Sequence, residues 1–161
     1  MARKLVIGNW KTHKTAAESE VFLRTLRAEP YAIDQYTGLD VILTPSFLAM
    51  RDAQRACEGS VIQLGAQNVD DHGSGSFCGG YPAALLREFC RYGFVGHSEQ
   101  RLYYGDTDER INRRLLACLE AGLTPILCAG ESREIYERGE TLSHVRRQLE
   151  RDLQSVTQPQ D

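Results

Sequence analysis

Two short polar clusters, each placed where an apolar run ends, contain the side chains best suited to chemistry. The first spans residues 8–11 and includes Asn9 and Lys11, and the second spans residues 96–99 and includes His97 and Glu99. In α/β proteins the reactive groups gather at the carboxyl ends of strands, so both clusters stand where an active site is expected. Together they offer an ammonium group, an amide, an imidazole and a carboxylate.

The first cluster has the composition of an anion site. Lys11 lies just beyond a predicted strand, where its positive charge suits a phosphate group or a developing oxyanion. Asn9, two residues earlier, projects to the same side of an extended chain and adds a donor. An ordinary surface lysine would explain Lys11 alone, but two convergent donors favour binding of an anion.

The second cluster centres on an imidazole. His97 follows Gly96, whose missing side chain lets the backbone approach a ligand closely. Ser98 is predicted to cap a short helical turn that runs to Arg101. The positive end of this turn disfavours a cationic ring, so we expect a neutral imidazole that donates a hydrogen bond to a substrate oxygen. A purely structural histidine is the alternative.

Alternating strand-like and helix-like stretches are expected to position these clusters. Apolar runs predict five strands, at residues 4–8, 39–43, 61–65, 92–95 and 123–128. Capping residues and apolar stripes predict five helices, at residues 15–27, 47–57, 82–89, 107–120 and 140–153. In the first helix the expected apolar stripe is Val21, Phe22, Leu23 and Leu26. Nearly continuous apolar strands separated by helices indicate a parallel sheet buried on both faces.

Two architectures suit about five β-α units in 161 residues. One is an open doubly wound sheet, complete as it stands, and the other is a (β/α)8 barrel that ends after its fifth unit. The periodicity of the sequence does not choose between them. Because no linker stands out, residues 1–161 are predicted to be one domain, with residues 154–161 as a frayed polar tail.

Composition excludes several other classes of protein. The net charge of −3, with no basic stripe, argues against nucleic acid as a partner. Apolar runs are too short to cross a membrane, and the N-terminus leaves no room for a secretory segment, so a cytoplasmic protein is expected. The five cysteines contain no C-x-x-C pair, so neither a zinc site nor a disulfide framework is expected. Four are predicted to be buried, whereas Cys78 lies in a glycine-rich loop and is expected to be exposed.

Five motifs in register make the chain similar to the first two thirds of the triosephosphate isomerase family, over about residues 3–153. The motifs occupy residues 8–11, 64–69, 73–77, 96–101 and 122–131. One such tetrapeptide could arise by chance, but five in order are specific. The resemblance implies a TIM (β/α)8-barrel fold, truncated here to about five β-α units.

The resemblance also implies an activity and roles for residues. The family interconverts dihydroxyacetone phosphate and glyceraldehyde 3-phosphate through an enediolate, an intramolecular aldose-ketose isomerisation that needs neither metal nor organic cofactor. Asn9 and Lys11 match substrate-binding residues, and Lys11 matches the catalytic lysine that stabilises the developing negative charge. His97 matches the neutral imidazole that polarises the substrate carbonyl. This role is implied by the resemblance to the family and does not follow from residue spacing in this chain. Glu99 matches a supporting carboxylate beside the lysine, and Cys128 a structural cysteine.

One part of the family's machinery has no match in this sequence. In the family the general base follows the sixth strand on a mobile lid, and later loops hold the phosphate. No such segment occurs here, so the general base is expected to be absent and the chain to be inactive or weakly active alone. Glu131 follows the fifth predicted strand, but it matches a structural position.

One loop bears on the oligomeric state. Residues 69–80 resemble the loop that reaches into the neighbouring subunit of the family's dimer, which implies a homodimer for the full-length form. An incomplete barrel also leaves the strands at residues 5–8 and 123–128 as open edges that favour self-association. The alternative function is a non-catalytic partial-barrel module that binds a phosphorylated triose or a partner chain.

Overall fold

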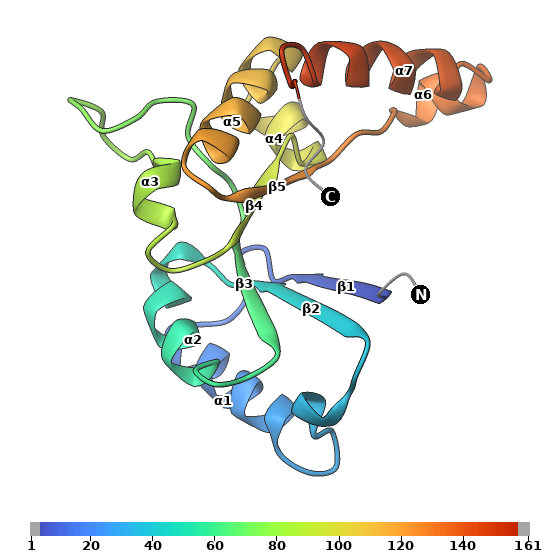
Figure 1. Cartoon of the computed structure of the whole chain (residues 1–161). Coiled ribbons are helices and arrows are strands. Elements are labelled where there is room, and N and C mark those ends of the chain that lie inside the picture. The colour runs from blue at the N-terminus through green and yellow to red at the C-terminus, as the bar shows by residue number, and fades with distance from the viewer. Residues whose placement is uncertain (1–3, 158–161) are drawn as a thin grey trace.

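A single curled parallel sheet organises the computed structural model, which describes residues 4–157 (Figure 1). The strands are β1 (Lys4–Asn9), β2 (Leu39–Thr44), β3 (Ile62–Ala66), β4 (Tyr92–Val95) and β5 (Thr124–Leu127). They neighbour one another in sequence order, β1-β2-β3-β4-β5, and every pairing is parallel. In a doubly wound sheet the strand order reverses at a switch point, although the strands stay parallel. The uninterrupted order seen here therefore favours the barrel arrangement, which the periodicity left open.

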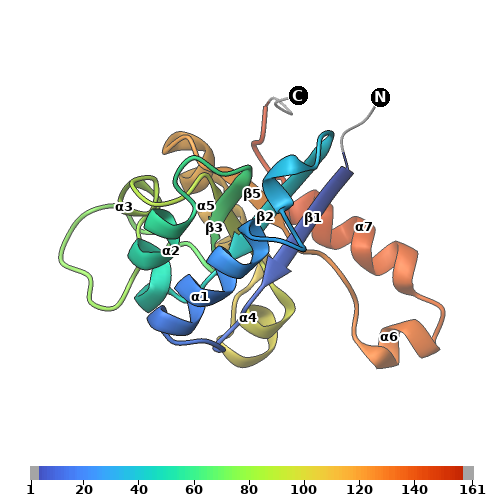
Figure 2. The ribbon, with the colours of Figure 1, turned by 90° about the horizontal axis from the view of Figure 1, so that it is seen from below.

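Seven helices lie on the outside of the curl within residues 4–157. They are α1 (Ala16–Arg27), α2 (Met50–Ala56), α3 (Ala83–Leu86), α4 (Ser98–Tyr103), α5 (Asp108–Glu120), α6 (Arg133–Glu137) and α7 (Thr141–Asp152), with 3-10 turns at Ile33–Gln35 and Phe47–Ala49. Figure 2 shows α1 and α2 side by side along the first three strands. On the other half of the sheet α5 covers β4 and β5, and α7 packs on α5.

The long helices begin where their capping residues predicted. Thr15 caps α1 through a reciprocal box, in which its hydroxyl accepts from the Glu18 amide at 3.3 Å and the Glu18 carboxylate accepts from the Thr15 amide at 2.8 Å. Thr107 caps α5 in the same position that the sequence indicated. The apolar stripe of α1 is only partly as predicted: Leu23 is fully buried, but Val21 is exposed and faces away from the sheet.

Shorter elements differ from expectation. The predicted helix at 82–89 is a single turn of α3, because residues 87–90 continue in tighter turns before β4 begins. The helix predicted at 47–57 starts as a 3-10 turn and becomes α-helical only at Met50. Helix α6 was not predicted, since its five residues carry no apolar stripe and Ser132 alone marks the start. No helix within residues 4–157 is long and apolar enough to span a membrane.

The two faces of the sheet have different tasks. Val41 and Leu43 of β2 face the helices and join the main core, which includes Leu23 of α1. Parallel register places Gly8 beside Leu43, and a side chain at residue 8 would approach the Leu43 methyl group to 2.8 Å. Glycine is therefore needed where β1 approaches the core. The alternate residues, including Asn9, face the inner side of the curl.

The polar tail predicted at residues 154–161 is described only in part, because residues 158–161 lie outside the described residues. At its start, the Asn112 side chain donates to the Gln154 carbonyl at 2.7 Å. The single-domain boundary of residues 1–161 stays a prediction. All five cysteines are free: Cys78 is exposed, as predicted, Cys128 is half-buried, and Cys57, Cys90 and Cys118 are buried.

Asp71 fastens the long loop after β3 to helix α5. Its carboxylate accepts from Arg113 at 3.0 Å and from Arg110 at 3.2 Å, and its side chain is 1% exposed. Burial raises the pKa of Asp71, but the hydrogen bonds from Arg113 and Arg110 outweigh it and lower the pKa to about 2. The loop is therefore held by a carboxylate that stays ionised in mild acid.

A pH dependence follows from this lowered pKa. In the unfolded chain the Asp71 pKa returns to about 3.9, so the contribution to stability, about 2 kcal/mol, is present above that pH. It is lost as the pH falls toward 2. We expect Asp71→Asn to remove this contribution at pH 7 and to flatten the fall in unfolding free energy between pH 4 and pH 2. Urea titrations across this range measure it, and an unchanged acid profile in the variant would contradict the assignment.

Candidate active site

The two polar clusters meet at the carboxyl ends of β1 and β4. The Lys11 Nζ atom lies 2.7 Å from Glu99 Oε1, although the residues are 88 positions apart in the chain. Curling of the parallel sheet therefore brings two separate strand ends together. The two clusters line the same pocket, of about 550 Å³.

Lys11 is held by its backbone as well as by its ion pair. Its φ of 52° is in the left-handed region, which is uncommon for a residue with a side chain. The Asn9 side-chain oxygen accepts from the Lys11 amide at 2.8 Å, and Gln67 donates to the Lys11 carbonyl at 2.7 Å and to the Thr44 carbonyl at 2.9 Å. Because Asn9 uses its oxygen in this turn, its amide N–H groups remain for a ligand.

Gln67 lines the pocket and holds the turn at Lys11, and the sequence analysis gave it no role. It belongs to the motif at residues 64–69 that resembles the family, but a glutamine at this position did not by itself indicate a role. Its position directly after β3 was the available signal, because it places a double donor between the ends of β1 and β2.

His97 is itself the cap of α4, which corrects the prediction that Ser98 has this role. The His97 backbone is extended, with φ −53° and ψ 141°, and its Nδ1 atom accepts from the Glu99 amide at 3.3 Å. An imidazole nitrogen with a lone pair can cap a helix as a hydroxyl does, and this was not considered from sequence. Since Nδ1 serves the cap, Nε2 is the ring nitrogen left to face a ligand.

His97 Nδ1 lies close to two groups of Glu99, the backbone amide and the side-chain carboxylate. His97 Nδ1 also lies 3.5 Å from Glu99 Oε2, a contact that becomes an ion pair only if the ring is protonated. The cap hydrogen bond from the amide is shorter and uses the Nδ1 lone pair. The His97 ring is also held against Phe94 by an edge contact, with 5.9 Å between the ring centroids.

Glu99 supports Lys11. The hydrogen bond from Lys11 lowers the Glu99 pKa, and the positive charge of Lys11 acts in the same direction. A carboxylate with a lowered pKa is a weak base, so Glu99 is suited to orienting an ammonium group and unsuited to abstracting a proton. The other carboxylate that lines this pocket is Asp70.

A buried charge network forms the wall of the pocket and was not predicted. Arg114 of α5 donates to Asp106 at 2.6 Å and to the Asn68 side-chain oxygen at 2.6 Å. Burial raises the pKa of Asp106 and lowers that of Arg114, and their close contact opposes both changes. This network joins the end of β3 to α5, so it stiffens the wall facing Lys11.

Glu131 and Cys128 lie beside a neighbouring pocket of about 610 Å³ that also includes His97. The Glu131 carboxylate accepts from the Thr141 hydroxyl at 2.9 Å, which anchors it to the start of α7. Burial raises the pKa of the Cys128 thiol, which donates to the Ile126 carbonyl at 3.9 Å. Structural roles for both residues stay predictions.

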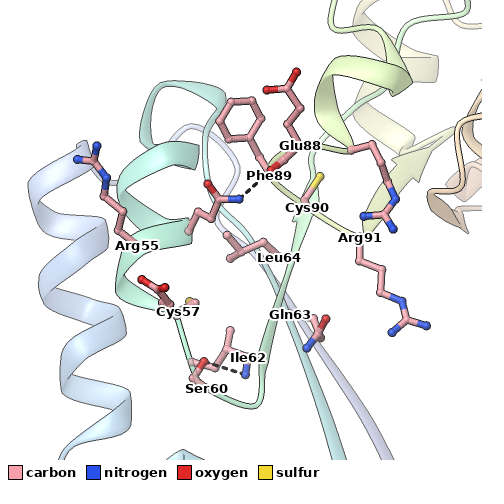
Figure 3. A pocket seen from close by; sticks show the side chains of 13 residues that line it. Arg55, Cys57, Ser60, Ile62, Gln63, Leu64, Glu88, Phe89, Cys90 and Arg91 are labelled. Atoms are coloured by element: carbon pink, nitrogen blue, oxygen red, sulfur yellow. Dashed lines mark hydrogen bonds between the residues drawn. The ribbon is translucent and has the colours of Figure 1, made fainter.

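A further pocket, of about 520 Å³, lies at the amino end of β3 and holds none of the predicted site residues (Figure 3). It is lined by Gln63 and Leu64 of β3, by residues of the end of α2 and just after it, and by residues that follow α3. Burial raises the pKa of Cys57 and of Cys90 to about 11, so both thiols are protonated at neutral pH. We assign no chemistry to this pocket.

The fold and the site together define a class of protein. A curled parallel sheet, with helices outside and reactive side chains at the carboxyl ends of its strands, is the architecture of the (β/α)8-barrel enzymes. The sequence model of one such family, triosephosphate isomerase, matches residues 4–161. The chain belongs to the triosephosphate isomerase family.

Individual relatives agree with this placement. A triosephosphate isomerase of Picosynechococcus is 42% identical over 158 residues, which cover 97% of this chain and 65% of the relative. The enzyme of Trichodesmium erythraeum is 40% identical and is also covered to 65%. The crystal structure of triosephosphate isomerase from Bartonella henselae superposes with a TM-score of 0.87 at 29% identity, covering 95% of this chain and 62% of that one. This chain therefore spans about 65% of the length of the relatives it matches.

Proposed function

We propose that this chain forms the substrate-binding and electrophilic part of a triosephosphate isomerase site. The reaction is the interconversion of dihydroxyacetone phosphate and glyceraldehyde 3-phosphate through an enediolate, in glycolysis and gluconeogenesis, with no metal or organic cofactor. The observation that carries the proposal is the convergence of Lys11, Glu99 and His97 on one pocket. Membership of the family supports the choice of substrate.

Each side chain has a distinct task in this proposal. The His97 Nε2–H donates to the carbonyl oxygen of the substrate, which draws electrons toward that oxygen as the neighbouring carbon loses its proton. The Lys11 ammonium group stabilises the negative charge that develops on the enediolate, and the Asn9 amide adds a hydrogen bond. These interactions strengthen as charge builds up, so they lower the barrier more than they tighten ground-state binding.

Proton abstraction is not assigned to a residue of this pocket. Glu99 is held by Lys11, and its lowered pKa makes it a poor base. The Glu131 carboxylate accepts a hydrogen bond from the Thr141 hydroxyl and lines the neighbouring pocket, so it is not assigned as the base either. We therefore expect the 161-residue chain to bind a phosphorylated triose and to turn it over slowly or not at all.

The assembly and the location are also proposals. The loop at residues 69–80, with Phe77 and Cys78 exposed, supports a homodimer in the full-length form of the kind that the resemblance implied. A cytoplasmic location accords with the metabolic role. No contact with nucleic acid or with a membrane is part of the proposal.

Titration of the chain with 2-phosphoglycolate tests the proposed site, because this anion combines a phosphate group with a carboxylate that resembles the enediolate in charge. We expect saturable binding by calorimetry, with NMR shift changes at Asn9, Lys11 and His97. A coupled assay on dihydroxyacetone phosphate then separates the two functions. Binding with slow or no turnover is the expected result, substantial turnover contradicts the need for a further base, and no binding at millimolar ligand overturns the proposal.

A further inference from the structure

One side chain just after β3 donates to the ends of two other strands. The Gln67 Nε2 atom lies 2.7 Å from the Lys11 carbonyl oxygen and 2.9 Å from the Thr44 carbonyl oxygen. A side-chain amide nitrogen carries two protons, so these two contacts use both of them. The Trp10 amide also donates to the Thr44 carbonyl, at 3.2 Å. The carboxyl ends of β1, β2 and β3 are therefore fastened together around the backbone of Lys11.

The backbone of Lys11 has a conformation that needs such support. Its φ of 52° lies in the left-handed region, which a residue with a Cβ atom adopts when its surroundings impose it. The Lys11 side chain is 48% exposed, so packing in the core does not impose this conformation. Two other side chains hold its peptide groups instead. The Asn9 oxygen accepts from the Lys11 amide at 2.8 Å, and Gln67 donates to the Lys11 carbonyl.

This left-handed turn determines where the Lys11 ammonium group lies. Changing φ from 52° to about −60°, the ordinary helical value, would rotate the Cα–Cβ bond by about 110° about the N–Cα bond. The ammonium group would then leave its place 2.7 Å from Glu99 Oε1, in the pocket that both residues line. Whatever holds the Lys11 backbone therefore also holds its charge.

We propose that Gln67 is a positioning residue for anion binding, because its two hydrogen bonds hold the left-handed turn that directs the Lys11 ammonium group into the pocket. This inference rests on the proposed function, in which Lys11 stabilises the negative charge of the ligand. Gln67 also lines the pocket, but both of its amide protons are engaged with backbone carbonyls. Its effect on a ligand is therefore exerted through Lys11.

NMR titration of the Glu99 side-chain carboxyl carbon tests the geometry without any ligand. In the parent chain the hydrogen bond from Lys11 lowers the Glu99 pKa. Gln67→Met keeps a similar length but donates no hydrogen bond, so we expect it to raise the Glu99 pKa toward its ordinary value, as Lys11→Met also should. Gln63→Met is the matched control, because Gln63 is a glutamine of β3 that lines the pocket at the amino end of this strand (Figure 3). It should leave the Glu99 pKa unchanged.

Calorimetry with 2-phosphoglycolate then tests whether Gln67 acts through Lys11. We expect Gln67→Met to weaken binding about 3- to 10-fold, and Gln63→Met to stay within about twofold of the parent. In the Lys11→Met chain the Gln67→Met change should alter the affinity by less than about twofold, because no ammonium group is left to position.

Two results overturn the proposal. One is a Glu99 pKa that rises in Lys11→Met but not in Gln67→Met, and the other is an equal loss of affinity from Gln67→Met with and without the Lys11 ammonium group. If the parent chain does not bind 2-phosphoglycolate, the proposed function fails, but the Glu99 titration still decides whether Gln67 positions Lys11.

Circular dichroism checks that each variant folds, since Gln67→Met leaves two carbonyls without this donor. If Gln67→Met does not fold, Gln67→Asn replaces it in both measurements. Asparagine keeps the amide but is one methylene shorter, which withdraws the donor from the two carbonyls. We expect changes in the same direction and of smaller size, and a Glu99 pKa and an affinity that both match the parent would overturn the proposal.

Discussion

Replacing Arg101 with alanine lowers the free energy of unfolding by about 3–5 kcal/mol, the largest stability effect that we expect from one surface-proximal residue. The Arg101 guanidinium donates to the carbonyls of Gly96 and Cys128 at 2.9 and 3.1 Å, and to the carboxylates of Asp108 and Asp152 at 2.7 and 2.6 Å. One side chain thus ties the ends of β4 and β5 to α5 and α7.

The size of the effect comes from Asp152. Its side chain is fully buried, and one of its oxygens has no hydrogen-bond partner in the described structure. Burial raises the Asp152 pKa, and the contact with Arg101 opposes that rise. Without Arg101 a buried carboxylate is left with no adjacent cation, so it must either take up a proton or draw in water.

Urea unfolding followed by circular dichroism measures this loss. Arg133→Ala is the matched control, because Arg133 also contacts a carboxylate at 2.7 Å, on Glu137, but both side chains are exposed. We expect the control to change stability by less than about 0.5 kcal/mol. If Arg101→Ala stays within about 1 kcal/mol of the parent chain, the four contacts do not act as a structural junction.

Replacing Lys11 with methionine weakens binding of 2-phosphoglycolate by about 10- to 100-fold, which follows from the loss of a charge-assisted hydrogen bond of about 1.5–3 kcal/mol. A second effect adds to the first. Glu99 loses the hydrogen bond that lowers its pKa, and its carboxylate is left facing the anionic ligand. The double variant Lys11→Met/Glu99→Gln is therefore expected to recover part of the lost affinity.

Lys14→Met is the matched control for this prediction. Lys14 is a lysine of the same loop, but its Nζ atom lies over the Phe22 ring, 4.8 Å from the centroid, and does not line the pocket. We expect calorimetry to give an affinity within about twofold of the parent for Lys14→Met. Equal losses from the two lysine variants would show general charge attraction and would remove the specific role of Lys11.

The elements that hold the site were largely predictable because their signals are local. Thr15 and Thr107 mark the starts of α1 and α5 through hydrogen bonds made within one turn. The ends of β1 and β4 are marked by the change from apolar residues to the clusters at 8–11 and 96–99. In a parallel sheet, strand ends that follow the same direction share one edge, so the shared pocket of these clusters followed from chemistry and topology together.

Other features depend on contacts between distant residues and had no local signal. Val21 belongs to the apolar stripe expected for α1, but its side chain is exposed. Leu23, two positions later on the helix, is the residue that is buried in the core. His97 rather than Ser98 caps α4, since the cap depends on the extended backbone at the end of β4. The ion pairs of Arg101 and Arg114 join segments that are neighbours only after the helices have packed.

The sequence by itself determined the strands, the long helices and the reactive groups at the strand ends, because periodicity, capping and residue type act over a few positions. Periodicity left the strand order open and the family resemblance implied a barrel; the tertiary structure shows the order, β1-β2-β3-β4-β5, that confirms it. The tertiary structure also decided the cap at His97, the left-handed turn at Lys11 and the hydrogen bonds of Gln67 to the ends of β1 and β2. These depend on which backbone groups face one another across the sheet, and that is settled only when separate segments meet.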